Sequence, residues 1–84
     1  MRILVVEDDT GIAQFLQQGL NEAGYAVDLA ENGNEGMEYA LSGEYDVFII
    51  DIQLPYLNGL DLLKTLRSEG VKSPIKIIIP NVKL

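Results

Sequence analysis

The chain has 84 residues, enough for one small domain, and 48% of them are hydrophobic while 23% are charged. This composition is typical of a globular domain and not of a disordered segment. The formal net charge of −7 argues against direct binding to nucleic acid, whose phosphates would be repelled. His and Cys are both absent, which excludes Ser-His-Asp and Cys-His catalytic systems, disulfides and the common zinc sites.

Apolar runs in the sequence are too short to span a bilayer, and the N-terminus lacks the layout of a signal peptide. Because Cys is also absent, we expect a cytoplasmic protein with no membrane association. Its chemistry would rest on carboxylates, hydroxyls, lysines and backbone groups.

Short β-rich runs alternate with segments of helical periodicity along the whole chain. A first strand is predicted at residues 2–6, and it ends at three consecutive acids, Glu7, Asp8 and Asp9. A helix follows, with Thr10 as its N-cap and Gly24 as its stop signal. The side chains predicted to face the core are Ile12, Phe15, Leu16 and Leu20.

A second strand is predicted at residues 25–29, and the pair Asn32-Gly33 follows it. This pair could form a hairpin turn, but no alternating strand comes after it, so a helix over residues 34–42 that ends at Gly43 fits better. The side chains of this helix predicted to face inward are Met37, Ala40 and Leu41.

The strongest strand is predicted at residues 47–50, which are continuously apolar, as in a central parallel strand, and lead into Asp51. A third helix, which Gly70 ends, and a fourth strand at residues 75–79 complete the pattern. Right-handed crossovers then give a (βα)₃β arrangement, an open doubly wound α/β sheet. The third helix is predicted to present Leu60, Leu63 and Leu66 on one face.

Acidic residues end two of the predicted strands. In open parallel sheets, ligands bind beyond the carboxyl ends of the strands, at a switch in strand order. If the first and third strands are neighbours, carboxylates of the Glu7–Asp9 run and of Asp51 converge. Such like charges favour a hard divalent cation such as Mg²⁺, beside which a carboxylate can attack a phosphoryl group. Alternatively, these acids only solvate the strand ends.

Three segments resemble the receiver domains of two-component response regulators, specifically transcription regulators that carry a winged-helix DNA-binding domain. The segments are Ile3–Asp9, Tyr45–Pro55 and Asn58–Leu63, and the similarity runs from Arg2 to about Ile75. The resemblance implies a flavodoxin-like fold with the strand order 2-1-3-4. It also implies a signalling protein that is not an enzyme and whose partner is a sensor histidine kinase.

The same resemblance implies roles for individual residues. Asp51 would accept a phosphoryl group from the kinase. Glu7 and Asp8 would hold Mg²⁺ together with Asp51 and the backbone carbonyl of Gln53, whereas Asp9 is either a further ligand or a solvated acid. The loop below the site would be shaped by two residues that could also be ordinary turn residues, Pro55 and Gly59.

Toward the C-terminus the similarity stops. The family has a hydroxyl residue at the end of its fourth strand, where this chain has Ile79 followed by Pro80. The Lys of the family's fifth strand has no counterpart, because Lys83 is predicted to be a tail residue, and Lys76 inside an apolar strand is also unlike the family. We therefore expect residues 1–84 to be a receiver domain that is truncated or frameshifted after its fourth strand, without the last two helices and the DNA-binding domain.

Such a truncation would leave the fourth strand as an open hydrophobic edge, so we expect a homodimer or a domain-swapped oligomer. Mg²⁺ binding should survive, but phosphotransfer should be slow and signal output should be lost. Two other functions stay open: a non-signalling assembly module that acts through the sheet edge, and a small phosphohydrolase. For the hydrolase, only Asp9 or Asp61 could act as the general acid-base.

Overall fold

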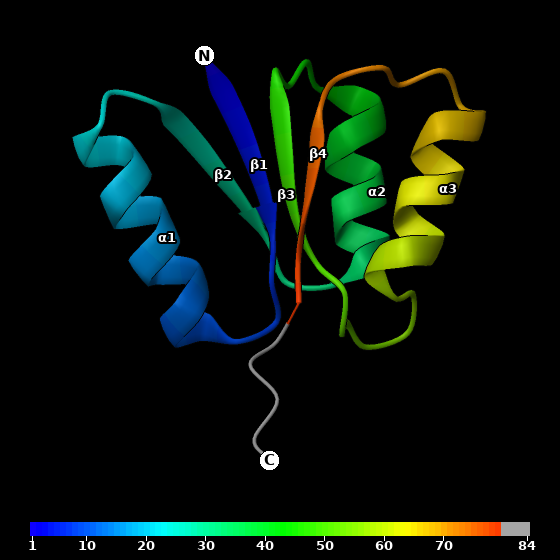
Figure 1. Ribbon diagram of the computed structural model, residues 1–84, viewed down its shortest axis with the longest axis horizontal. Coiled ribbons are helices and arrows are strands. Elements are labelled where there is room, and N and C mark those ends of the chain that lie inside the picture. The colour runs from blue at the N-terminus through cyan, green and yellow to red at the C-terminus, as the bar shows by residue number, and fades with distance from the viewer. Residues whose placement is uncertain (80–84) are drawn as a thin grey trace.

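Strands and helices alternate along the chain in a computed structural model that describes residues 1–79 (Figure 1). The strands are β1 (Arg2–Val6), β2 (Ala26–Ala30), β3 (Val47–Asp51) and β4 (Ile75–Ile78). The helices are α1 (Thr10–Glu22), α2 (Gly33–Ser42) and α3 (Gly59–Ser68). The predicted alternation is confirmed, including the helix that follows Asn32.

The four strands form one parallel sheet in the order β2-β1-β3-β4. This confirms the predicted flavodoxin-like, doubly wound α/β sheet. Helix α1 lies on one face of the sheet, and α2 and α3 lie on the other (Figure 1). Val6 pairs with Ile50, so β1 and β3 end side by side. The strand order reverses between these two strands, and the loops that follow them therefore meet at the switch point.

Each face of the sheet carries an apolar cluster. The larger one lies between the sheet and the helices α2 and α3, and it includes the nearly inaccessible side chains of Phe48 and Leu62. The smaller one lies under α1 and is built on Ile3, Val5 and Val27. Burial of these side chains is the main term that stabilises the fold.

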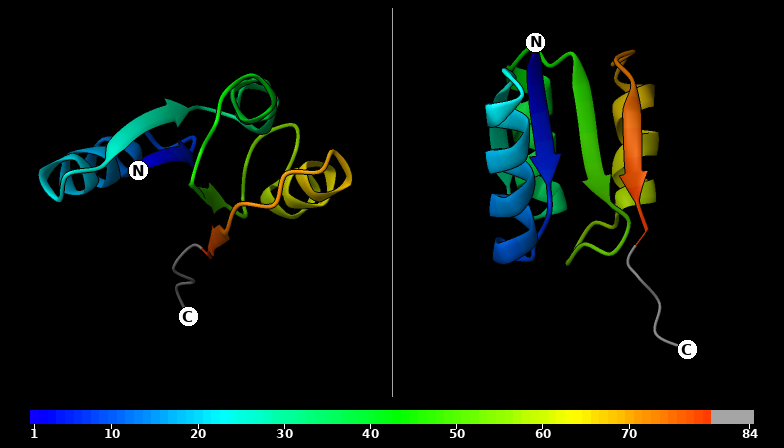
Figure 2. Two further views of the ribbon diagram at one scale, coloured as in Figure 1. Left: turned by 90° about the horizontal axis from the view of Figure 1, so that it is seen from above. Right: turned by 60° about the vertical axis from the view of Figure 1, so that its left-hand side comes forward.

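The face that carries α1 is covered unevenly. In the part of the chain that the structure describes, no helix lies over β3 and β4 on this face (Figure 2, right). Val47 and Ile49 are only half-buried there, as is Ile78, while Lys76 is exposed. Strand β4 is one of the two edge strands of the four-stranded sheet, and β2 is the other.

The predicted inward face of α1 is wrong in part. Phe15 and Ile12 are 77% and 46% exposed, and the buried position of the helix is Ala13. Leu16 and Leu20 do pack against the smaller cluster, as predicted. Apolar residues occupy two adjacent stripes of α1, and periodicity alone does not tell which stripe faces the sheet.

Similar shifts occur in the other two helices. Leu41 and Leu60 are exposed, although both were expected to face the core. In α3 it is Leu62, together with Leu66, that fills the core. In α2, Met37 and Ala40 pack inward as predicted.

Strand β4 ends at Ile78, one residue earlier than predicted, and Ile79 is exposed. Pro80 and Lys83 lie outside the described residues. Within residues 1–79, the helices are too short or too polar to cross a membrane.

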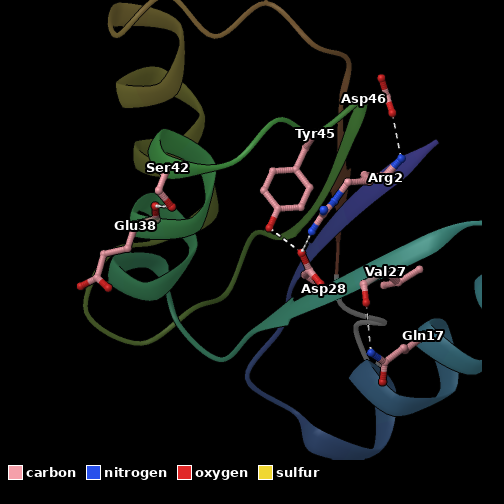
Figure 3. Close-up of polar contacts among 8 residues, drawn as sticks. All are labelled: Arg2, Gln17, Val27, Asp28, Glu38, Ser42, Tyr45 and Asp46. Atoms are coloured by element: carbon pink, nitrogen blue, oxygen red, sulfur yellow. Dashed lines mark hydrogen bonds and ion pairs between the residues drawn. The ribbon is translucent and has the colours of Figure 1, made fainter.

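Polar side chains form a hydrogen-bond network around Arg2, at the start of β1 (Figure 3). The hydroxyl of Tyr45 and the guanidinium of Arg2 both donate to Asp28 Oδ2, at 2.7 and 2.6 Å. The backbone N–H of Arg2 donates to Asp46 Oδ2 at 2.8 Å. Burial and the neighbouring Asp28 raise the pKa of Tyr45 to about 12, so its hydroxyl stays protonated as a donor. This network ties β1 and β2 to the segment before β3.

Candidate functional site

Three carboxylates converge at the carboxyl edge of the sheet. Glu7 and Asp8 follow β1, and Asp51 is the last residue of the neighbouring strand β3. One oxygen from each residue lies within 4.8 Å of the other two. Glu7 and Asp51 are only 3% and 6% exposed, whereas Asp8 is exposed. The parallel strands thus bring together the carboxylates that the sequence analysis singled out.

Electrostatic repulsion and burial both act on Glu7. Burial, and after it contact with Asp51, raise the pKa of its carboxyl from 4.5 to about 7, although the N–H of Asp9 favours the ionised form. That N–H donates to Glu7 Oε2 at 3.1 Å. A site whose carboxylate resists ionisation gains from a cation that compensates the charge. Three oxygen donors at this spacing fit a hard divalent ion such as Mg²⁺.

Asp9, in the loop between β1 and α1, has a different role from Glu7 and Asp8. Its Oδ1 accepts the backbone N–H of Ile12 at 3.0 Å, which makes Asp9 the N-cap of α1. The prediction that Thr10 is the N-cap is therefore wrong, and Thr10 is the first helical residue. Both residue types cap helices well, so the sequence did not separate them. The Asp9 carboxylate is directed at the helix and is not one of the three convergent groups.

The loop between β3 and α3 holds the Asp51 carboxylate in place. Asp51 Oδ1 accepts the backbone N–H of Gln53 at 2.9 Å. The N–H of Gly59 donates to the carbonyl of Ile52 at 3.0 Å. A Cβ at Gly59 would lie 2.3 Å from the carbonyl oxygen of Asp51, which no real contact allows. Gly59 is thus required for the close approach of α3 to the end of β3.

Tyr56, in the same loop, has a backbone conformation that the sequence did not predict. It has a φ of 70° and is 88% exposed. The N–H of Leu57 donates to the carbonyl of Pro55 at 2.8 Å, so Tyr56 is the central residue of a γ-turn of the rare positive-φ form. Residue type gave no signal for this conformation, because Gly and Asn are the residues that usually adopt it. Leu57 packs against the start of α2, where a Cβ at Gly33 would meet its carbonyl oxygen at 2.3 Å.

Comparison with known proteins places this geometry in a family. The sequence matches the response regulator receiver domain over residues 3–81. Transcriptional regulatory protein DltR of Streptococcus agalactiae is 49% identical over 75 residues, which are 89% of this chain and 34% of DltR. Transcriptional regulatory protein CusR of Escherichia coli is 45% identical over 78 residues, which are 93% of this chain and 34% of CusR. The chain spans about a third of the length of these curated relatives.

Solved structures agree with the sequence match. The receiver domain of a Francisella response regulator superposes with a TM-score of 0.91 at 37% identity, over 93% of this chain and 64% of that one. Response regulator TrrA of Thermotoga maritima, solved in complex with Mg²⁺ and BeF, has a TM-score of 0.89 at 38% identity, over 93% of this chain and 68% of that one. The chain therefore belongs to the response regulator receiver domain family of two-component signalling.

Proposed function

We propose that Asp51 is the phosphoacceptor of this receiver domain. Its carboxylate is buried at the end of a central strand, and the N–H of Gln53 fixes its orientation. One of its oxygens would attack the phosphorus of a phosphohistidine, forming an acyl phosphate on Asp51 as the phosphorus–nitrogen bond breaks. The convergence of Glu7 and Asp8 on this same carboxylate is the observation that carries the proposal.

Glu7, Asp8 and Asp51 would hold Mg²⁺ together with the backbone carbonyl of Gln53. Bound Mg²⁺ would supply compensation for the charge on the phosphoryl oxygens. The mutual distances of the three carboxylates and the raised pKa of Glu7 support this ligand set. The exposed Asp8 lies where the cluster reaches solvent, which gives a donor access to Asp51.

The phosphoryl donor would be a sensor histidine kinase, because the chain belongs to the receiver-domain family of two-component signalling. Ile12 and Phe15 offer such a partner a contact surface beside the site. Both lie in the first turns of α1, which begins directly after Asp9, and both are exposed, Phe15 more than Ile12. Exposed apolar side chains next to a reacting group are typical of a protein-docking surface.

Phosphotransfer to this chain would be slow. Ile79, which follows β4 and is exposed, stands where the family has a hydroxyl residue, and its side chain offers no donor to a phosphoryl oxygen. Loss of one such donor typically lowers a rate by about 10²–10³. The conformational output that depends on this hydroxyl would be lost with it.

Self-association through β4 would accompany this function, as a homodimer or by exchange of elements. In the ladder with β3, the carbonyl of Ile78 accepts the N–H of Ile52, so the alternating backbone groups of Ile75 and Ile77 face away from β3. A second chain could pair with these groups. Sedimentation velocity at micromolar concentration tests this, and a single monomeric species would contradict it.

The two other functions are not favoured. The family match and the convergent carboxylates point to signalling and not to a module that serves assembly alone. A phosphohydrolase would need a general acid-base, but Asp9 caps α1 and Asp61 is exposed in the first turn of α3.

Intact-mass analysis after incubation with acetyl phosphate and Mg²⁺ tests the proposed function. One added phosphoryl group is expected in the wild type and in Asp61→Asn, which removes a carboxylate outside the cluster. No addition is expected in Asp51→Asn. Equal modification of Asp51→Asn and the wild type would contradict the proposal.

A further inference from the structure

A hollow of about 320 Å³ lies at the outer edge of β2, apart from the acidic cluster. Its walls come from the first half of α1 and from α2, which lie on opposite faces of the sheet at this edge (Figures 1 and 2). Leu29 of β2 lies between the walls, which include Gln14 on one side and Tyr39 on the other. Apolar and polar surface are therefore mixed in one concave site.

The strand in this hollow is an unpaired edge of the described sheet, because β2 has β1 as its neighbour on one side only. The N–H of Ala26 donates to the carbonyl of Met1, and the carbonyl of Ala30 accepts the N–H of Glu7. Alternate residues of a parallel strand point their backbone groups to opposite sides. Leu29 therefore directs its N–H and its carbonyl away from β1, toward the hollow.

The backbone groups on either side of Leu29 form hydrogen bonds with side chains. The Nε2 of Gln17 donates to the carbonyl of Val27 at 3.2 Å (Figure 3). The Oε1 of Glu35 accepts the N–H of Glu31 at 3.1 Å. These contacts cover the ends of the edge and leave the middle, at Leu29, open to a further strand. Edge groups of this kind are the usual template for strand addition.

The charge around the hollow is of one sign. Residues 3–63 contain no Lys or Arg, and all of the acidic residues except Glu69 lie in this range. Glu31 and Glu35 both line the hollow, and none of its lining residues within the described range 1–79 is basic. The ring of Tyr39 adds a face that can contact a cation or an alkyl chain. The complementary ligand is therefore basic.

We propose that the hollow is a docking site for an extended basic segment of a partner protein. The segment would add to β2 as a further strand, pairing with the backbone of Leu29. It would place a Lys or Arg side chain against Glu31 and Glu35. Main-chain pairing would supply affinity, and the charged contact would select the sequence. This site is separate from the phosphoacceptor and does not depend on its chemistry.

The test uses a short capped peptide of alternating Lys and Val, titrated into the ¹⁵N-labelled chain, with an alternating Glu-Val peptide as the negative control. We expect saturable amide shifts at Leu29 and Glu31, and slower hydrogen exchange of the Leu29 amide. In the double variant Glu31→Gln with Glu35→Gln, affinity should fall by about tenfold or more. Gln at position 35 can still accept the N–H of residue 31, so the local fold is kept.

The matched control is the double variant Glu38→Gln with Glu44→Gln, which removes the same charge from exposed positions outside the hollow. Its affinity should stay within about twofold of the wild type. Equal loss in both double variants would overturn the proposal in favour of general attraction to an acidic surface. Strand addition would be overturned if butylamine bound as tightly as the peptide and the peptide did not protect the Leu29 amide from hydrogen exchange. Absence of saturable shifts would overturn the site itself.

Discussion

Burial of Glu7 should make the stability of the metal-free domain depend on pH. The pKa of Glu7 is raised from 4.5 to about 7 in the folded state, where Asp8 and Asp51 face it, so the folded chain binds the proton more tightly than the unfolded chain. The resulting stabilisation is complete below pH 4.5 and is lost as the pH rises through about 7. From about pH 5.5 to about pH 8, this group should lower the free energy of unfolding by about 2 kcal/mol.

Urea unfolding at these two pH values, followed by circular dichroism in the presence of EDTA, measures the effect. Glu7→Gln is the matched control, because the amide has nearly the same volume and cannot ionise in this range. The contribution of about 2 kcal/mol should disappear in the variant. A wild type whose stability rises over this interval, or a variant that keeps the full decrease, would refute the reasoning.

The same titration should govern the binding of Mg²⁺. At about pH 5.5 only about 3% of Glu7 would be ionised, so Mg²⁺ should bind roughly 30-fold more weakly than at about pH 8. Isothermal titration calorimetry at the two pH values measures this ratio. Equal affinity at both would remove Glu7 from the ligand set.

Three substitutions test other parts of the site. Gly59→Ala places a Cβ 2.3 Å from the Asp51 carbonyl oxygen, so it should destabilise the fold by about 1–3 kcal/mol in urea unfolding and slow acetyl-phosphate labelling. Phe15→Ala should slow phosphotransfer from a histidine kinase by about tenfold while leaving labelling by acetyl phosphate unchanged. Ile79→Thr restores a hydroxyl donor and should speed labelling by about tenfold or more.

Each of these predictions has a result that would count against it. A Gly59→Ala protein as stable as the wild type would mean that the loop can move to accept the Cβ without loss of stability. Equal slowing of kinase and acetyl-phosphate reactions in Phe15→Ala would indicate a structural defect and not a lost contact. An unchanged labelling rate in Ile79→Thr would show that position 79 does not reach the phosphoryl group.

The sheet and the convergence of Glu7, Asp8 and Asp51 could be predicted from the sequence because both follow from local patterns. Continuous apolar runs indicated the buried strands. Acids follow two of these runs directly, and they lie close together because the two strands are neighbours in the sheet. Gly24 and Gly70, predicted to end helices, have φ values of 97° and 86°, which favour Gly. The register of the parallel strands then fixed where Glu7 and Asp51 meet.

What the sequence did not predict depends on tertiary packing. The exposed stripe of α1 at Phe15 became evident only when Ala13 was found against the sheet. Tyr56 has its positive φ in a loop that is held at two places. Leu57 packs against Gly33, and Gly59 packs against the end of β3. The hollow beside Leu29 depends on three elements at once, and none of their local patterns contains it.

The residue that carries the phosphoryl group can be identified by chemical trapping. After reaction with acetyl phosphate and Mg²⁺, hydroxylamine converts an acyl phosphate into a hydroxamate, which tandem mass spectrometry assigns to a residue. We expect a hydroxamate at Asp51 alone. A hydroxamate at Asp8 or Glu7 with Asp51 unmodified would contradict the assignment of the phosphoacceptor.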